Sequence, residues 1–99
     1  MNQPLIDIRA WRQFAMVAEE LHFGRAAQRL HITQPPLTQA IANLERQLGV
    51  PLFERSKRHV RLTPAGEALL PHAQDLIARA HAMPEQARAA ANGEAGRLR

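Results

Sequence analysis

Seven side chains that could recognise a polar partner gather around a pair of adjacent prolines. They are small or hydrogen-bonding, and they are Thr33, Gln34, Pro35, Pro36, Thr38, Gln39 and Asn43. Gln and Asn amides can form paired hydrogen bonds with adenine, and Thr or Pro can pack against the methyl group of thymine. A polar helix surface needs no partner, so an ordinary exposed position is the open alternative for Gln39.

A second group of side chains consists of cations. Arg55, Lys57 and Arg58 occupy three of four consecutive positions, and His59 follows them. A loop with this charge can lie along a phosphate backbone and insert a guanidinium into a minor groove, where the negative potential deepens as the groove narrows. Phosphate contacts of this kind position a protein without reading sequence. The alternative is a solvated, charge-rich turn.

The positive charge of the chain is concentrated in its middle. Residues 24–62 contain seven Arg or Lys and two Glu, whereas the rest of the chain contains six basic and seven acidic residues. The middle segment therefore carries the whole formal excess, which is +4 for the chain. A localised basic excess is the footprint of a polyanionic partner, although uneven salt bridging on a solvated surface would give the same count.

Hydrophobic periodicity predicts three helices that would position these side chains. Apolar residues recur at helical spacing over 7–20, with Asp7 as the N-cap, and a short helix is expected over 24–30. A third helix is expected over 34–48, with its polar side opposite an apolar stripe formed by Leu37, Ile41, Leu44 and Leu48. Prolines cost little in a first helical turn, because the N–H groups there have no partner within the helix. Thr33 or Gln34 can cap this helix, and Gly49 suits its C-terminal end.

The remainder of the chain predicts a hairpin and a long helix. Residues 52–54 and 60–62 read as two short strands around the basic loop. A fourth helix begins at Thr63 and Pro64, with a gentle kink expected at Pro71. Steps of four and three along this helix form a heptad seam, the pattern of helix pairing, through Leu69, Ala73, Leu76, Ala80 and Met83. The segment from residue 84 onward, poor in bulky apolar residues, is expected to be a linker.

Three stretches resemble the amino-terminal DNA-binding domain of LysR-type transcriptional regulators. They are FAMVAEELHFGRAAQRLHITQPPLTQAIANLE at 14–45, LGVPLFER at 48–55 and LTPAGE at 62–67. The resemblance implies a mainly α winged helix-turn-helix, with three helices and a short β-hairpin wing, followed by a long dimerisation or linker helix. It divides the chain into a DNA-binding domain over 1–62, a linker and dimerisation helix over 63–90, and a flexible tail over 91–99.

The resemblance also implies roles for the two groups of side chains. The positions of Gln34, Pro35, Pro36, Thr38 and Gln39 would face the major groove of double-stranded DNA, and Arg55 would serve the wing. A homodimer would read an interrupted inverted repeat, since a two-fold protein reads a two-fold site. The sequence departs from the family at Gln39, where Arg is more common, and at Thr38, which replaces Ser. It also stops where a ligand-sensing domain would follow, so we expect a fragment of a longer, tetrameric regulator whose small-molecule inducer binds only that absent domain.

Other classes of function find little support in the sequence. The chain has no Cys, so disulfides, thiolate metal sites and Cys nucleophiles are excluded. No two of the five His stand at metal-binding spacing, and the single Ser has no recognisable catalytic partners. We therefore expect no enzymatic activity, no metal and no cofactor. No apolar run approaches the ~20 residues that a membrane span needs, so a cytoplasmic protein is expected. A dimerisation module alone is the remaining rival, but it leaves the basic segment unexplained.

Overall fold

The computed structural model describes residues 5–97. Three helices come first: α1 (Ile8–Glu20), α2 (Phe23–Leu30) and α3 (Gln34–Leu48). The first and third match the ranges expected from periodicity. The second begins one residue earlier than expected, because the ring of His22 provides its cap.

Side chains and left-handed residues set the ends of these helices. The Asp7 carboxylate accepts from the backbone N–H of Arg9 at 2.8 Å, and Nδ1 of His22 accepts from the backbone N–H of Arg25 at 2.9 Å. These acceptors satisfy first-turn donors that have no partner within the helix. Helix α3 begins at Gln34 with prolines in its first turn, and the hydroxyl of Thr33 makes no capping hydrogen bond. It ends as expected at Gly49, whose φ of 75° is a left-handed conformation.

The hairpin consists of β1 (Phe53–Arg55) and β2 (Val60–Leu62), paired antiparallel. The first strand starts one residue later than the sequence predicted. Leu52 lies outside the ladder because its N–H donates to the Glu45 carboxylate and its carbonyl accepts from the N–H of Thr63. Ser56 closes the turn: its Oγ accepts from the N–H groups of Arg58 at 3.3 Å and His59 at 3.0 Å.

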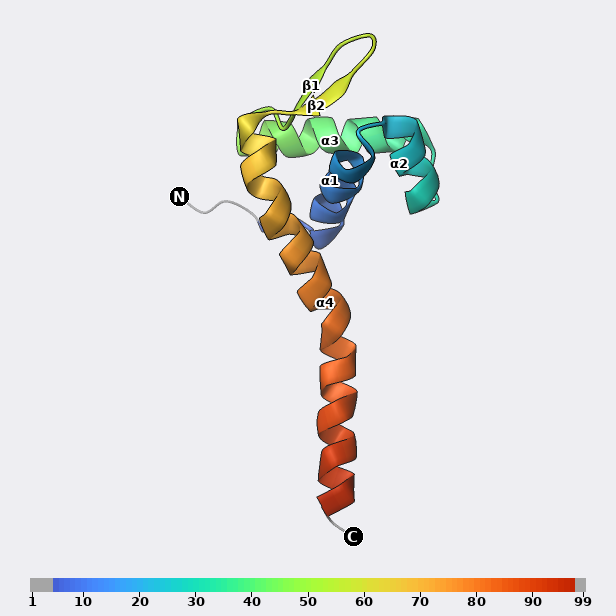
Figure 1. Ribbon diagram of the computed structural model, residues 1–99, viewed down its shortest axis with the longest axis vertical. Coiled ribbons are helices and arrows are strands. Elements are labelled where there is room, and N and C mark those ends of the chain that lie inside the picture. The colour runs from blue at the N-terminus through green and yellow to red at the C-terminus, as the bar shows by residue number, and fades with distance from the viewer. Residues whose placement is uncertain (1–4, 98–99) are drawn as a thin grey trace.

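Helix α4 (Pro64–Arg97) starts as the sequence predicted. Oγ1 of Thr63 accepts from the N–H of Gly66 at 3.1 Å and donates to the carbonyl of Pro51 at 2.7 Å. The helix runs unbroken through two prolines, and its axis bends gently within its first half (Figure 1).

The C-terminal end of α4 corrects one expectation. The sequence predicts a helix that ends near residue 90 and a flexible tail over 91–99, yet the helix continues to Arg97. Residues 91–97 contain two Ala, one Glu and one Arg, which favour a helix, together with two Gly and one Asn, which do not. Residues 98–99 of the expected tail lie outside the described part of the chain.

One core joins all the helices and the hairpin. Phe14, Val17, Leu37, Ile41, Leu44 and Leu52 are its largest fully buried side chains. Three of the four aromatic residues pack there as rings, with centroids 5.5 Å apart for Phe14 and Phe53 and 6.0 Å apart for Phe23 and Phe53. Burying such a side chain contributes about 1.5–3 kcal/mol. Ala26 and Ala27, which are 0% and 3% exposed, keep α2 close to its neighbours.

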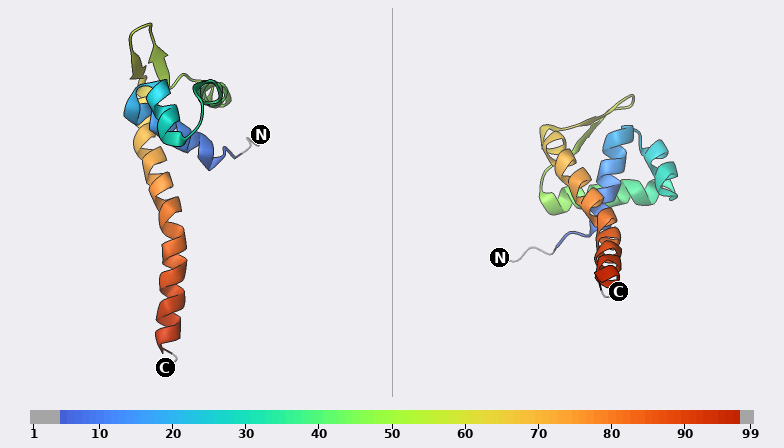
Figure 2. Two further views of the ribbon diagram at one scale, coloured as in Figure 1. Left: turned by 90° about the vertical axis from the view of Figure 1, so that its right-hand side faces the viewer. Right: turned by 60° about the horizontal axis from the view of Figure 1, so that its bottom comes forward.

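Helix α4 starts beside the hairpin, packs along α1 and extends past the three-helix unit on the side away from the hairpin tip. Figures 1 and 2 show the hairpin projecting from one end, while α4 extends away from the other. The molecule is accordingly elongated, measuring 64 × 37 × 22 Å along its principal axes. The observed architecture is therefore the winged helix-turn-helix with a long terminal helix that the sequence predicted.

Candidate nucleic-acid interface

The polar side of α3 is free, while its apolar side is anchored in the core. Leu37 and Ile41 are 0% exposed and Leu44 is 1% exposed, so the helix cannot rotate without opening the core. On the other side, Thr38 is half-buried and the remaining six predicted residues are exposed: Thr33, Gln34, Pro35, Pro36, Gln39 and Asn43. The seven predicted residues thus run from the N-cap of α3 to Asn43 in its second half, and all lie outside the buried apolar stripe.

Hydrogen bonds arrange part of this face in advance. Nε2 of Gln39 donates to Oδ1 of Asn43 at 3.1 Å, and a guanidinium N–H of Arg46 donates to the same oxygen. The Asn43 amide nitrogen and the Gln39 amide oxygen remain available to a ligand, as one donor and one acceptor. Gln34, Pro35, Thr38 and Gln39 line a shallow depression at the start of the helix.

A second depression connects this face to the hairpin. It runs from the start of α2 to the tip of the wing, and Gln34 lines it together with Lys57 and Arg58. The beginning of α3 and the basic tip of the hairpin therefore face the same space. One ligand that occupies this depression would contact both the start of α3 and the tip of the hairpin.

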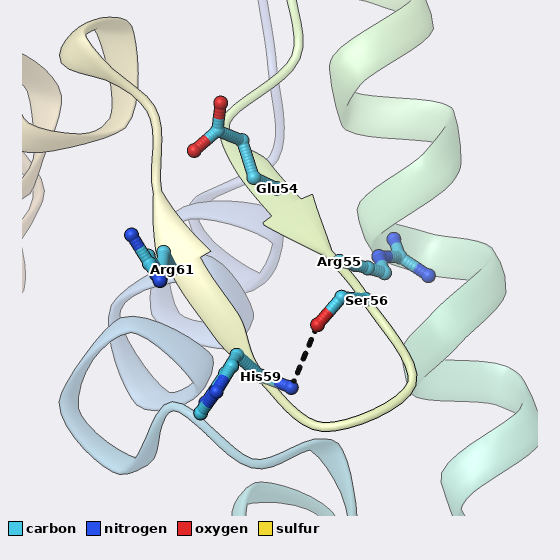
Figure 3. Close-up of a pocket in the computed structure, with 5 residues that line it drawn as sticks. All are labelled: Glu54, Arg55, Ser56, His59 and Arg61. Carbon is cyan, nitrogen blue, oxygen red and sulfur yellow. Dashed lines mark hydrogen bonds between the residues drawn. The ribbon is translucent and has the colours of Figure 1, made fainter.

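The three cations predicted for the wing have different surroundings. Lys57 and Arg58 are exposed at the tip, and neither forms an ion pair within residues 5–97. Figure 3 shows Arg55 directed from β1 toward α3, whereas Glu54 and Arg61 point away from that helix. The Arg55 guanidinium lies 4.5 Å from the centroid of the Phe23 ring.

Arg55 differs from Lys57 and Arg58 in having partners within its own chain. Its Nη2 lies 3.9 Å from Oε1 of Glu45, and its side chain is 37% exposed. A guanidinium stacks on an aromatic face and pairs with a carboxylate at the same time, so Arg55 interacts chiefly with its own chain. The spacing of charges along a loop does not show which of them turn inward.

Two further basic residues counted in the middle segment are paired with α1. Arg29 lies 2.9 Å from Oε2 of Glu20 and 3.4 Å from Oε1 of Glu19, and Arg25 lies 3.2 Å from Oε1 of Glu20. The hydrogen bond from Arg29, assisted by Arg25, holds the pKa of Glu20 below its ordinary value despite partial desolvation. Because Arg25 and Arg29 are paired, the remaining positive charge of residues 24–62 lies on the hairpin and on the exposed side of α3.

Glu45 is a residue of this region that sequence reasoning missed. Its Oε2 accepts from the backbone N–H of Leu52 at 2.7 Å and of Phe53 at 3.2 Å. The signal that could have found it is its charge, because Glu45 is one of only two acidic residues within 24–62. An acidic residue within a basic segment indicates a specific contact, which here is made with two backbone N–H groups.

The heptad seam divides into a buried part and a free part. Ala73 is 2% exposed and belongs to the core, and Leu69 packs against that core. Ala73 therefore has little surface left for a partner, whereas Leu69 is half-buried. Heptad spacing alone does not distinguish a partner helix in another chain from α1 in the same chain. The free part consists of Leu76, half-buried Ala80 and Met83, with Leu76 42% and Met83 63% exposed.

Two other types of site do not occur in the part of the chain that the structure describes. No cluster of three or more His, Cys, Asp or Glu that could hold a metal ion occurs in that range. Every helix there is also too short or too polar to cross a membrane.

Residues 8–67 match the family model described as bacterial regulatory helix-turn-helix protein, lysR family. Among curated relatives, the HTH-type transcriptional regulator IlvR of Caulobacter vibrioides is 56% identical over 93 residues, which cover 94% of this chain and 31% of IlvR. The chain spans about a third of the length of the curated relatives it matches.

Two solved structures of DNA complexes have the same fold. In the CbnR DBD–DNA complex, the similar protein chain is 42% identical with a TM-score of 0.81, and the match covers 87% of this chain and 99% of that one. In the complex of the BenM DBD with catB site 1 DNA, the values are 38% and 0.82, with coverage of 87% and 97%.

Proposed function

The chain belongs to the LysR family of bacterial regulatory helix-turn-helix proteins, and we propose that it binds double-stranded DNA sequence-specifically as the DNA-binding part of a transcriptional regulator. One observation carries the proposal: α3 and the residue before it present seven small or hydrogen-bonding side chains, six of them exposed and Thr38 half-buried, while Leu37, Ile41 and Leu44 anchor the helix in the core. A helix of this kind fits the major groove, where each base pair presents its own pattern of donors and acceptors.

Each part of the proposed interface has its own task. Thr33, Gln34, Pro35, Pro36, Thr38, Gln39 and Asn43 lie in the major groove and read bases. Lys57 and Arg58 follow the backbone at the adjacent minor groove, because both are exposed at the hairpin tip and have no ion-pair partner in residues 5–97. Arg55 supports the wing from inside rather than entering the groove.

The proposal also covers the oligomeric state of the protein, its inducer and its location in the cell. Two copies form a homodimer through the free part of the α4 seam and read an interrupted inverted repeat. The full-length protein, of which relatives suggest this is about a third, is a tetramer whose small-molecule inducer binds outside these residues. The protein acts in the cytoplasm and has no catalytic role, since regulation by DNA binding requires neither an active site nor a cofactor.

Selection of bound duplexes from a random library tests this proposal. The purified chain should enrich one interrupted inverted repeat, and Gln34→Ala should change the preferred bases at one position of each half-site. Each good paired contact contributes about 1–3 kcal/mol of discrimination, so the change should be visible as a loss of roughly five- to 150-fold in preference. A chain that retains no duplex at low salt, or enriches no common sequence, would refute it.

A dimerisation role without DNA binding is the second candidate, supported by the exposed apolar side chains of α4. The double variant Leu76→Gln and Met83→Gln separates the two roles without touching Ala73 or the core. In the proposed DNA-binding dimer, this variant should sediment as a monomer and lose affinity for the two-half-site duplex while retaining weak binding to a single half-site. Unchanged sedimentation would remove the seam from the proposal.

A further inference from the structure

We propose that Glu45 and Arg55 are positioning residues that fix the angle between the wing and α3. The basic tip, formed by Lys57 and Arg58, and the reading face, which is the exposed side of α3, can then contact DNA at the same time. This inference rests on the proposed DNA-binding function and deepens it. Neither residue needs to touch DNA for its replacement to weaken binding. The geometry that supports the inference involves three elements: α2, α3 and β1.

Glu45 connects α3 to the base of the wing. It lies on the last turns of the helix, and its side chain is 18% exposed. Both hydrogen bonds that its Oε2 accepts come from successive backbone N–H groups, those of Leu52 and Phe53, where the chain enters β1. Hydrogen bonds to a carboxylate are stronger than neutral ones, and two on one oxygen define a direction as well as a distance. The start of the wing is therefore held by the helix that carries the reading face.

Arg55 connects the other end of β1 to α2. Its guanidinium lies over the ring of Phe23 and beside the second oxygen of Glu45. Phe23 is 7% exposed and packs edge-on against Phe53, so the ring itself cannot move freely. Three-residue strands have too few ladder hydrogen bonds to fix a hairpin by themselves. The contacts of Glu45 at one end of β1 and of Arg55 at the other therefore add to the few ladder hydrogen bonds that hold the hairpin in place.

The sign of the effect separates this role from simple electrostatics. Removing a carboxylate near a polyanion should strengthen binding, because one repulsive charge disappears. If Glu45 positions the wing, its neutralisation should weaken binding instead. Glu54 offers a matched control: it lies on β1, is exposed, points away from α3 in Figure 3, and forms no ion pair within residues 5–97.

The experiment compares Glu45→Gln with Glu54→Gln in the full chain on its selected duplex. Glu45→Gln should lose affinity by about tenfold, the size of one typical charge-assisted hydrogen bond. Glu54→Gln should bind as well as the unaltered chain or better. Hydrogen exchange gives a readout without DNA: the amides of Leu52 and Phe53 should exchange faster in Glu45→Gln and unchanged in Glu54→Gln. Circular dichroism checks that the helices persist, which is expected because Gln retains one oxygen acceptor.

A double-mutant cycle tests Arg55. Arg55→Gln should weaken binding in the unaltered chain but cost little more when Lys57 and Arg58 are already replaced by Gln, because the position of a wing without its cations no longer affects binding. Additive losses would instead identify Arg55 as a direct DNA contact. If Glu45→Gln fails to fold, this cycle and exchange in Arg55→Gln still decide the question.

Three results would overturn the inference: tighter binding by Glu45→Gln, unchanged exchange at Leu52 and Phe53, or additivity in the cycle. Its failure is distinguishable from failure of the proposed function. If the unaltered chain binds no duplex, the proposed function falls, while the exchange comparison still reports whether Glu45 and Arg55 hold the wing.

Discussion

Replacing the two cations at the wing tip gives the most quantitative test of the proposed function. Lys57 and Arg58 are both exposed, and neither has an ion-pair partner in residues 5–97, so their charges are available to phosphates without breaking an internal contact. Replacing both with Gln should leave the fold intact. The turn itself is held by Ser56, whose hydroxyl and N–H bond to backbone groups of residues 58 and 59 rather than to either side chain.

The magnitude follows from counterion release. For each phosphate of B-DNA that the protein no longer neutralises, the slope of log K against log salt becomes shallower by about 0.9. The double variant should therefore show a slope smaller by about 1.8 for each DNA-bound chain. Between 50 and 200 mM salt, the unaltered chain should lose roughly 12-fold more affinity than the variant, since the salt ratio is about four. The loss should be similar on selected and scrambled duplexes, because phosphates carry no base identity.

Fluorescence anisotropy over a salt series measures this slope directly. The matched control is Arg79→Gln with Arg88→Gln, which removes the same charge from α4, where the two residues pair with Asp75 and Glu85. The control should keep the original slope. If both double variants lower the slope equally, the effect is one of net charge, and the assignment of the wing to the DNA backbone is wrong.

Three further predictions address the reading face, the wing base and the α1–α2 contact. Gln39→Arg adds a cation to the exposed side of α3, so binding should tighten on all duplexes and the salt slope should steepen by about 0.9, as the same anisotropy series would show. Gly66→Ala should lower the free energy of unfolding by about 1–3 kcal/mol, because the added Cβ would collide with the carbonyl oxygen of Leu52 and lie 2.8 Å from Cδ2 of Leu62. Gly93→Ala, with nothing within 4 Å of its added Cβ, is the control, and urea denaturation should show no loss. Glu20→Gln should destabilise the chain at neutral pH but not in acid: the pKa of Glu20 is lowered in the folded chain by Arg29, so its contribution is present above the ordinary value of 4.5 and disappears as the pH falls through the folded value. A stability gap that does not shrink as the pH falls below 4.5 would contradict this linkage.

Much of the fold was predictable because its signals are local. The range of α3 follows from an apolar stripe, prolines that fit only a first turn, and a glycine that fits the left-handed end. The start of α4 follows in the same way from the hydroxyl of Thr63 and the proline after it. The small errors at α2 and β1 arise from side chains whose hydrogen bonds to the backbone the periodicity does not show. The ring of His22 extends one helix, and the carboxylate of Glu45 holds Leu52 out of the ladder.

The candidate site was predicted less evenly. The seven residues proposed to read DNA were predicted from the apolar stripe that defines the opposite side of the helix, and burial of Leu37 and Ile41 confirms that stripe. The cations could not be sorted in this way. Arg25, Arg29 and Arg55 find partners that are distant in sequence or on another element, so a count of charges along the chain overstates the free positive surface.

Burial of part of the α4 seam within the chain itself restricts the geometry of the proposed dimer. Ala73 is buried against the chain's own core, so the first turns of α4 have a fixed direction relative to α1 and, through the shared core, to α3. Met83 lies ten residues further on, about 15 Å along the helix. A second copy that packs on Leu76 and Met83 would therefore meet a rigid arm rather than a flexible linker. In the proposed complex, the distance between the two reading helices follows from that arm, and the spacing of half-sites that the dimer accepts should be narrow.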